Sequence, residues 1–215
     1  MSDADTRLRL RRLDAFAFRA PTPEPVATSF GTMRDRPAVF IRLEDRDGAW
    51  GWGEAFANWP IAAAEHRVNL AVDDIAGLVL GAEDAGPEAL FDRLAAATHI
   101  RALQSGEWGP FRQVSAAVDT ALWDLIARRA GRRLADMLAN ETAADVVPAY
   151  ASGIPCHHGA GAVSAATPHR AFKVKVGYDD RRDLGHLADT ASALPAGATL
   201  MADANQAWDV AAAER

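Results

Sequence analysis

Two short apolar runs of the sequence each end in a pair of polar residues spaced two apart. The run AFKVKVG carries Lys173 and Lys175, and the run LMADAN ends in Asp203 and Asn205. In a β-strand, residues i and i+2 point to the same face, so each pair shares a face if both runs are strands. We therefore expect two ammonium groups and a carboxylate to project from the ends of successive strands.

The composition argues against several kinds of partner. The 215 residues are 49% hydrophobic and 24% charged, which is ordinary for one or two globular domains. Lys and Arg number 23 against 29 Asp and Glu, a net charge of -6, so the overall field gives no reason to bind nucleic acid or an anionic membrane. An anionic small substrate remains compatible with this charge, because the local field of a pocket can oppose the global sign.

Cysteine content and hydropathy bear on the compartment. Cys156 is the only cysteine, which excludes an internal disulfide and suits a reducing environment. The N-terminal stretch MSDADTRLRLRRLDAFAF has no apolar block of signal-peptide length, and no later run approaches the length of a membrane span. We expect a cytoplasmic protein.

The first 55 residues show the alternation of antiparallel strands. A first strand is predicted over Leu8–Phe18, interrupted by the Pro-rich segment at 20–25. Residues 26–37 have no clear period and are predicted to form a loop, the kind of segment on which binding residues often lie. The runs 38–45 and 49–54 flank an Asp-Gly turn, which predicts a hairpin.

The apolar spacing then becomes helical. Three helices are predicted at about 61–80, 87–103 and 110–130, the second beginning at Pro87 and the third ending at Gly131. The third has a continuous apolar face, which must pack against an extensive surface. A short helix is predicted in the run LADMLAN that follows.

After residue 146 the pattern is strand, helix and strand. Strands are predicted at 146–153, 171–176 and 198–203, with a helix at 180–194 before the last of them. Alternation of this kind predicts parallel strands joined by crossover helices. The first crossover is rich in Gly, Ala, His and Pro, and AGAVSAA is its only candidate helix, so we expect an irregular connection there.

This order of elements resembles the enolase superfamily and, within it, the mandelate racemase and muconate lactonizing enzyme groups. The resemblance rests on GWGE at 51–54, on SAAVDTALWDLIARRAGRRLADML at 115–138, and above all on FKVKVG and ADANQAW. It implies an α+β capping domain at 1–145, with an antiparallel sheet plus a helical bundle, followed by a (β/α)8 TIM-type barrel. A barrel of that type takes about 250 residues, so 146–215 would hold only its first three strands.

The resemblance also implies a role for each residue of the two motifs. Lys175 matches the base that takes a proton from the carbon next to a substrate carboxylate. Lys173 matches the neighbour that helps to hold that carboxylate and keeps the pKa of the base low. Asp203 matches the first of three carboxylates that bind Mg²⁺, and Asn205 matches a polar residue beside the metal. A substrate lid is implied at Phe30, Met33, Asn58 and Trp59.

General chemistry agrees with these roles. Removing a proton next to a carboxylate creates a doubly negative enediolate, which a divalent cation and ammonium groups stabilise. A lysine has an ordinary pKa of about 10.4, so it acts as a base near neutral pH only where burial or a neighbouring cation lowers that pKa. The implied enzyme is a racemase, epimerase, cycloisomerase or acid-sugar dehydratase for a small carboxylate, and a homo-oligomer once the barrel is complete.

Other interpretations stay open. One carboxylate and an amide hold Mg²⁺ poorly, so the chain could be an inactive fragment or an interaction module. A barrel enzyme with Lys173 or Lys175 as a Schiff-base nucleophile is a further alternative. Without its context, a strand-end lysine pair is usually a solvated edge, and Asp203 between a strand and a helix suits a helix N-cap.

Overall fold

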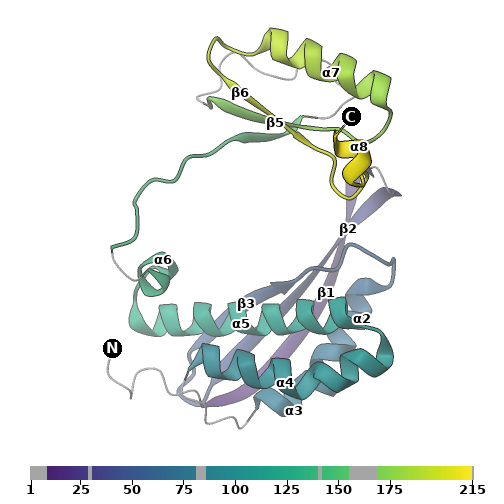
Figure 1. Cartoon of the computed structure of the whole chain (residues 1–215). Coiled ribbons are helices and arrows are strands. Elements are labelled where there is room, and N and C mark those ends of the chain that lie inside the picture. Colours follow the sequence, from purple (N-terminus) through teal and green to yellow (C-terminus); the bar gives the residue numbers. More distant parts are fainter. Residues whose placement is uncertain (1–8, 29–30, 81–85, 140–141, 155–168, 215) are drawn as a thin grey trace. The chain divides into compact units, whose positions relative to one another are not determined.

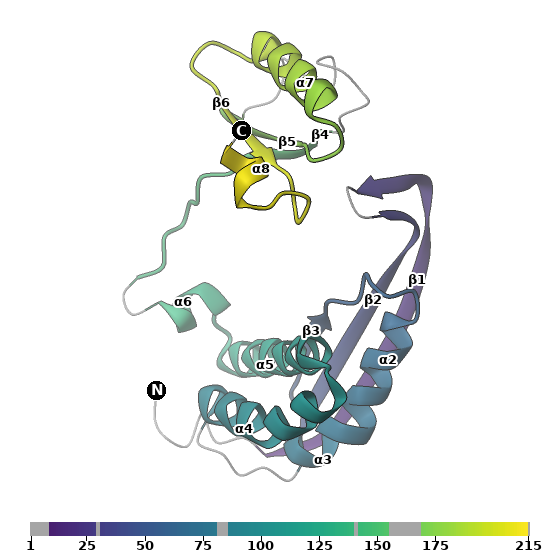
Figure 2. The ribbon, with the colours of Figure 1, turned by 45° about the vertical axis from the view of Figure 1, so that its right-hand side comes forward.

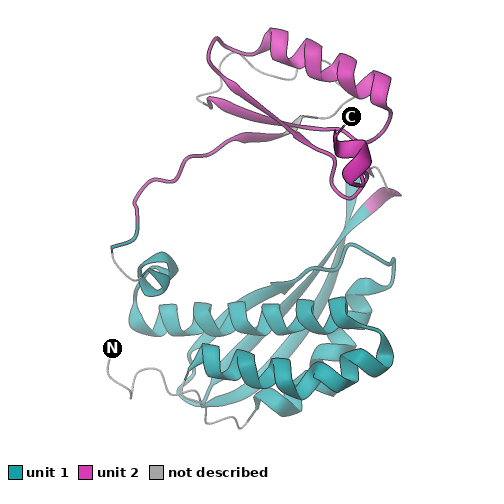
Figure 3. Ribbon diagram, in the orientation of Figure 1, with its two compact units in different colours: residues 1–22, 35–143 teal, residues 23–34, 144–215 magenta. Residues whose placement is uncertain are grey.

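A computed structural model of the chain describes residues 9–28, 31–80, 86–139, 142–154 and 169–214 (Figure 1). The chain forms two compact units (Figure 3). The first contains Met1–Thr22 and Asp35–Ala143, and the second contains Pro23–Arg34 and Ala144–Arg215. Each unit has its own hydrophobic core.

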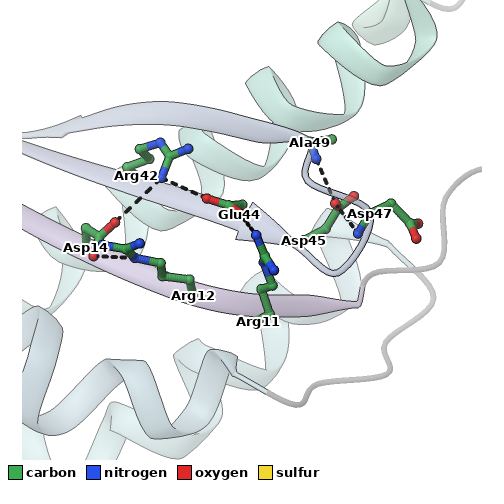
Figure 4. A network of polar contacts seen from close by, with 8 residues as sticks. All are labelled: Arg11, Arg12, Asp14, Arg42, Glu44, Asp45, Asp47 and Ala49. Carbon is green, nitrogen blue, oxygen red and sulfur yellow. Dashed lines mark hydrogen bonds and ion pairs between the residues drawn. The ribbon is translucent and has the colours of Figure 1, made fainter.

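An antiparallel sheet consists of β1 (Leu10–Thr28), β2 (Gly31–Asp45) and β3 (Trp50–Ala55), in the order β1-β2-β3, and all of it except Pro23–Arg34 belongs to the first unit. β2 and β3 pair antiparallel, which confirms the predicted hairpin. Asp45 fixes the turn between them (Figure 4), because its Oδ1 accepts the N–H groups of Asp47 and Ala49, each at 2.9 Å.

The predicted interruption at 20–25 and the predicted loop at 26–37 are both wrong. β1 runs through the Pro-rich segment to Thr28, and β2 begins at Gly31. The prolines stand at alternate positions, so their missing N–H groups all belong to one edge of the strand. β1 is an edge strand and needs to pair on one side only, which is where prolines are tolerated.

Helical segments cover one face of the sheet in the first unit. α2 (Ala63–Asn69), a π-helix η1 (Leu70–Ile75) and α3 (Ala76–Val79) replace the single regular helix predicted at 61–80. α4 (Pro87–Ser105) and α5 (Trp108–Ala130) lie side by side, as Figure 2 shows, and a short α6 (Leu134–Leu138) follows. α4 begins at the predicted proline, and Gly131 closes α5 in the left-handed conformation.

β3 packs directly onto the backbone of α5, at Gly51 and Gly53. A Cβ atom at Gly51 would lie 2.2 Å from the carbonyl oxygen of Ala121, and one at Gly53 would lie 1.9 Å from that of Ala117. Only glycine permits this approach. Asp124 of α5 also accepts the N–H of Trp52 at 2.9 Å, a group that β3, as an edge strand, leaves unpaired.

The second unit contains the predicted parallel strands, β4 (Ala151–Ile154), β5 (Ala171–Lys175) and β6 (Thr199–Asp203), in the order β4-β5-β6. α7 (Asp180–Ala193) joins β5 to β6, as predicted, and Asp179 caps it by accepting the N–H of Arg182 at 2.9 Å. A short α8 (Val210–Glu214) ends the described chain. The candidate helix AGAVSAA lies outside the described residues.

The prediction for the first strand of this unit needs correction. The predicted strand 146–153 forms a ladder only from Ala151, and Val146 and Val147 are 84% and 76% exposed. Among the described residues no second strand lies beside 146–150, so this apolar run has no sheet to join. Over the described ranges, no helix is long and apolar enough to cross a membrane.

Replacing Gly53 by alanine is expected to destabilise the first unit strongly. The added carbon would meet a backbone oxygen of α5, which cannot rotate away as a side chain can. We expect a loss of about 3 kcal/mol in the free energy of unfolding, the upper end of the usual cost of overpacking. Urea unfolding followed by circular dichroism measures it.

Gly77→Ala in α3 is the matched control, because no atom lies within 4 Å of a Cβ at that position. There the higher helix propensity of alanine is expected to stabilise the fold by up to about 1 kcal/mol. Two equally small effects would contradict the close packing of β3 on α5.

Candidate active site

The side chains of β5 alternate between two environments. Phe172, Val174 and Val176 are fully buried in the core of the second unit, to which Leu187 of α7 contributes. Lys173 and Lys175 point to the opposite face, with side chains 22% and 32% exposed. The period of two therefore places both lysines on one face of the sheet, as the sequence predicts.

Asp203 lies beside the lysines because of the strand register. In the parallel pairing of β5 with β6, Lys175 stands opposite Asp203. Oδ2 of Asp203 lies 2.7 Å from Nζ of Lys175 and 3.0 Å from Nζ of Lys173. Lys175 also donates to Oδ1 of Asn205 at 2.8 Å. The structure thus brings together all four residues of the two motifs.

Asn205 closes the group through its backbone as well as its side chain. Its N–H donates to Oδ1 of Asp203 at 2.8 Å, and its φ is +51°, in the left-handed region that asparagine tolerates better than most residues. Both carboxylate oxygens of Asp203 therefore accept hydrogen bonds. Asp203 is the last residue of β6, its side chain accepts from the turn that follows, and it caps no helix among the described residues.

The charges of the group shift the pKa values of its members. The hydrogen bond from Lys175 holds the pKa of Asp203 well below its usual range, and the N–H of Asn205 and the ammonium of Lys173 add to that effect. The hydrogen bond to Asp203 raises the pKa of Lys173 above its ordinary value. Nζ of Lys173 also lies 5.4 Å from the centre of the Tyr150 ring, a cation-π distance.

The side-chain oxygen atoms of this group are of the type that a hard divalent cation prefers as ligands. Asp203 and Asn205 supply oxygen atoms, which Mg²⁺ prefers, and both side chains reach the same ammonium group. In the part of the chain that the structure describes, no three His, Cys, Asp or Glu side chains are grouped to hold a metal. The oxygen donors that this group offers are thus one carboxylate and one amide.

A buried carboxylate that the sequence reasoning missed shapes the turn after β5. Oδ2 of Asp183 accepts the N–H groups of Gly177 at 2.6 Å and Tyr178 at 2.9 Å, and the residue is 3% exposed. Gly177 has a φ of +92°, and a Cβ there would lie 2.7 Å from Cβ of Ala207. The signal in the sequence is an Asp six residues after the glycine that ends a strand.

The four lid residues fall in different parts of the structure. Phe30 lies outside the described residues. Met33 is 8% exposed and belongs to the second unit, where Tyr178 donates to the carbonyl of Ala27 at 3.1 Å. Asn58 and Trp59 belong to the first unit. Their common role in a lid stays a prediction.

Comparison with known proteins identifies the family. Residues 12–139 match the N-terminal domain of the mandelate racemase / muconate lactonizing enzyme family. The antiparallel sheet with its helices, followed by parallel strands, is the arrangement expected for this group of the enolase superfamily. The chain therefore belongs to the mandelate racemase / muconate lactonizing enzyme family.

Three relatives illustrate the match. The chain is 31% identical to 3,6-anhydro-alpha-L-galactonate cycloisomerase from Streptomyces coelicolor, over 96% of this chain and 57% of that protein. A mandelate racemase/muconate lactonizing enzyme from Bordetella bronchiseptica RB50 is 41% identical with a TM-score of 0.83, covering 94% of this chain and 53% of that one. A racemase from Streptomyces coelicolor A3(2) with bound magnesium is 29% identical with a TM-score of 0.80, covering 95% and 57%. The chain spans a little over half the length of these relatives.

Asp183→Ala is expected to loosen the turn that follows Lys175. It leaves the N–H groups of Gly177 and Tyr178 without their acceptor, which costs about 2 kcal/mol or more. Asp183→Asn keeps an oxygen that accepts these N–H groups. Its NH₂ group replaces Oδ1, which has no hydrogen-bond partner among the described residues, so we expect the free energy of unfolding to fall by less than about 1 kcal/mol. Thermal unfolding of both variants tests this, and equal losses would contradict it.

Proposed function

We propose that this chain carries part of the active site of a Mg²⁺-dependent enzyme that removes the proton α to a substrate carboxylate, by way of an enediolate. The observation that carries this proposal is the contact of both β5 lysines with one carboxylate oxygen of β6, at 2.7 and 3.0 Å. Two ammonium groups and a carboxylate are the charges that this reaction requires. Relatives named as a cycloisomerase and as a racemase with bound magnesium support the reaction class.

Each residue of the group has a role in the proposal. Asp203 and Asn205 would hold Mg²⁺ through their side-chain oxygens. When bound, the cation supplies positive charge that offsets the second negative charge on the substrate as the α-proton leaves. Lys173 binds the substrate carboxylate, and Lys175 takes the proton.

Lys175 must give up two contacts before it acts as a base. Its Nζ donates to Oδ2 of Asp203 at 2.7 Å and to Oδ1 of Asn205 at 2.8 Å. Nζ accepts the α-proton only after it has left these oxygens and lost a proton of its own. Nζ of Lys173 contacts the same oxygen of Asp203, at 3.0 Å.

The substrate class proposed is a small carboxylate, as the name of the galactonate cycloisomerase indicates for that relative. The reaction is a racemisation, epimerisation, cycloisomerisation or elimination, and it belongs to the whole protein, because the chain spans only a little over half the length of its relatives. We also propose that 1–145 form the capping domain and 146–215 the start of the barrel.

The Schiff-base alternative is less well supported. A nucleophilic lysine has to be neutral, whereas Lys173 and Lys175 are both ion-paired with Asp203. That mechanism also leaves Asp203 and Asn205 without a role. The alternative of an inactive fragment is distinguished by the two experiments that follow.

Mg²⁺ is expected to stabilise the chain through Asp203. At ten times the dissociation constant, a ligand of the folded state alone adds about 1.4 kcal/mol, or roughly 3 to 5 °C in Tm for a chain of this size. Asp203→Ala should abolish this rise, whereas Asp189→Asn on the exposed side of α7 should retain it. Differential scanning calorimetry with NaCl of equal ionic strength as reference measures it, and no rise in the wild type would favour the inactive fragment.

Lys175→Ala is expected to abolish exchange of the substrate α-proton with deuterated solvent. Loss of a general base lowers the rate by about 10² to 10⁴-fold. Arg181→Ala, which removes an exposed cation of α7, is the control and should exchange at the wild-type rate. Proton NMR of a panel of 2-hydroxy acids and acid sugars with Mg²⁺ follows the exchange. Exchange retained in Lys175→Ala would refute the role of this lysine.

A further inference from the structure

The buried face of α7 is polar. The residues of this helix that are almost fully buried are Asp183, His186 and Thr190, with exposed fractions of 3%, 7% and 0%. Their spacing of three and seven residues places them on one stripe of the helix. Burying a polar atom without a hydrogen bond is costly, so each of these side chains requires a partner.

Each of the three side chains has one atom without a partner. Oδ1 of Asp183, Nε2 of His186 and Oγ1 of Thr190 are buried and have no hydrogen-bond partner among the described residues. The other oxygen of Asp183 accepts the N–H groups of Gly177 and Tyr178, in the turn after β5. The row of unpartnered atoms therefore begins beside this turn and continues toward the C-terminal end of α7.

The hydroxyl group of Thr190 differs from other hydroxyl groups on the helices. Those of Thr98, Thr120 and Ser192 each donate to the carbonyl oxygen four residues earlier, at 2.7, 2.9 and 2.9 Å. The carbonyl in the same position relative to Thr190 is that of His186, and the hydroxyl does not contact it. The hydroxyl is thus directed away from its own backbone, which leaves it available to a different partner.

The spacing along the helix excludes one small ligand as the common partner. A rise of about 1.5 Å per residue separates Asp183 from Thr190 by about 10 Å, and both side chains lean toward the N-terminus of the helix. A metal ion with bonds of about 2.0 to 2.6 Å bridges ligand atoms at most about 5 Å apart. A water molecule with two hydrogen bonds of about 2.8 Å spans at most about 5.6 Å. At least two small ligands are therefore required, with His186 between them.

We infer that the buried face of α7 binds a file of at least two internal water molecules, which link Oδ1 of Asp183, Nε2 of His186 and Oγ1 of Thr190. Water suits this set because the carboxylate oxygen requires a donor, whereas the imidazole nitrogen and the hydroxyl group can donate or accept. Buried water molecules typically make about three hydrogen bonds to groups that have no other partner. Through the two oxygens of Asp183, the file connects the turn after β5 with the far end of α7.

Thr190→Val tests the inference by the sign of its effect. If the hydroxyl binds water, its removal costs about one hydrogen bond, and amide hydrogen exchange in β5 and β6 is expected to become about fivefold faster. If the hydroxyl has no partner, valine removes the cost of burying it, and exchange becomes slower.

Ser192→Ala is the matched control, because it removes an exposed hydroxyl of the same helix that bonds the carbonyl of Ala188. Exchange in β5 and β6 should stay within about twofold of the wild type. Unchanged or slower exchange in Thr190→Val, or equal acceleration in both variants, would overturn the inference.

A second measurement detects the water in the unchanged chain. Nuclear Overhauser transfer from water is expected at the imidazole of His186 and the methyl group of Thr190, with the sign of a long-lived bound molecule. The methyl group of Thr98 is the reference, because Thr98 is also buried and its hydroxyl bonds its own helix. Absence of transfer at His186 and Thr190 would assign their partner to a protein group and overturn the inference, whatever the exchange rates. Neither readout requires Mg²⁺ or a substrate, so both are independent of the proposed function.

Discussion

The hydrogen-bonded pairing of β5 with β6 is the constraint on which the candidate active site depends. It places Lys175 opposite Asp203, and a slip of one residue would turn the side chain of Asp203 to the other face of the sheet. The register is held by the buried residues that alternate with the lysines, Phe172 and Val174. The packing that stabilises this small sheet therefore also positions its charged group.

A different constraint organises the first unit. Gly51 and Gly53 let β3 contact the backbone of α5, and Asp124 accepts the N–H of Trp52 from the edge of that strand. Because this interaction uses the inner face and the free edge of β3, the opposite face is left with its large side chains. The exposed tryptophans Trp50 and Trp52 and the tight helix contact are thus two results of the same alternation of glycine and tryptophan in β3.

The spacing of apolar residues and the positions of Gly and Pro predicted most of the elements, because these local patterns determine them. The hairpin, α4, α5, β5, α7 and β6 appear close to their predicted positions. The extension of β1 through Pro21, Pro23 and Pro25 was not predictable, since it depends on the strand being at an edge. Likewise, the π-helical turn from Leu70 has no local signature in the sequence.

The candidate site was predictable to a similar extent. Spacing alone placed each polar pair on one face, but the shared contact of both lysines with Asp203 depends on the strand register. The role of Asp183 was missed because a helical Asp looks solvent-exposed in a sequence, whereas here it is turned back to the strand end. Both contacts join residues that the periodicity of the sequence does not relate to each other.

The contact between β3 and α5 has a consequence for the order in which the chain folds. Trp52 and its acceptor Asp124 are 72 residues apart, so closing this contact carries a loop-closure cost that local contacts do not have. At about 5 to 20 residues per second, synthesis of that segment takes roughly 4 to 14 s. During this time the finished hairpin of β2 and β3 has neither its helix nor a partner for its edge. It is the kind of segment that chaperones cover, and slower elongation across α4 would lengthen its exposure.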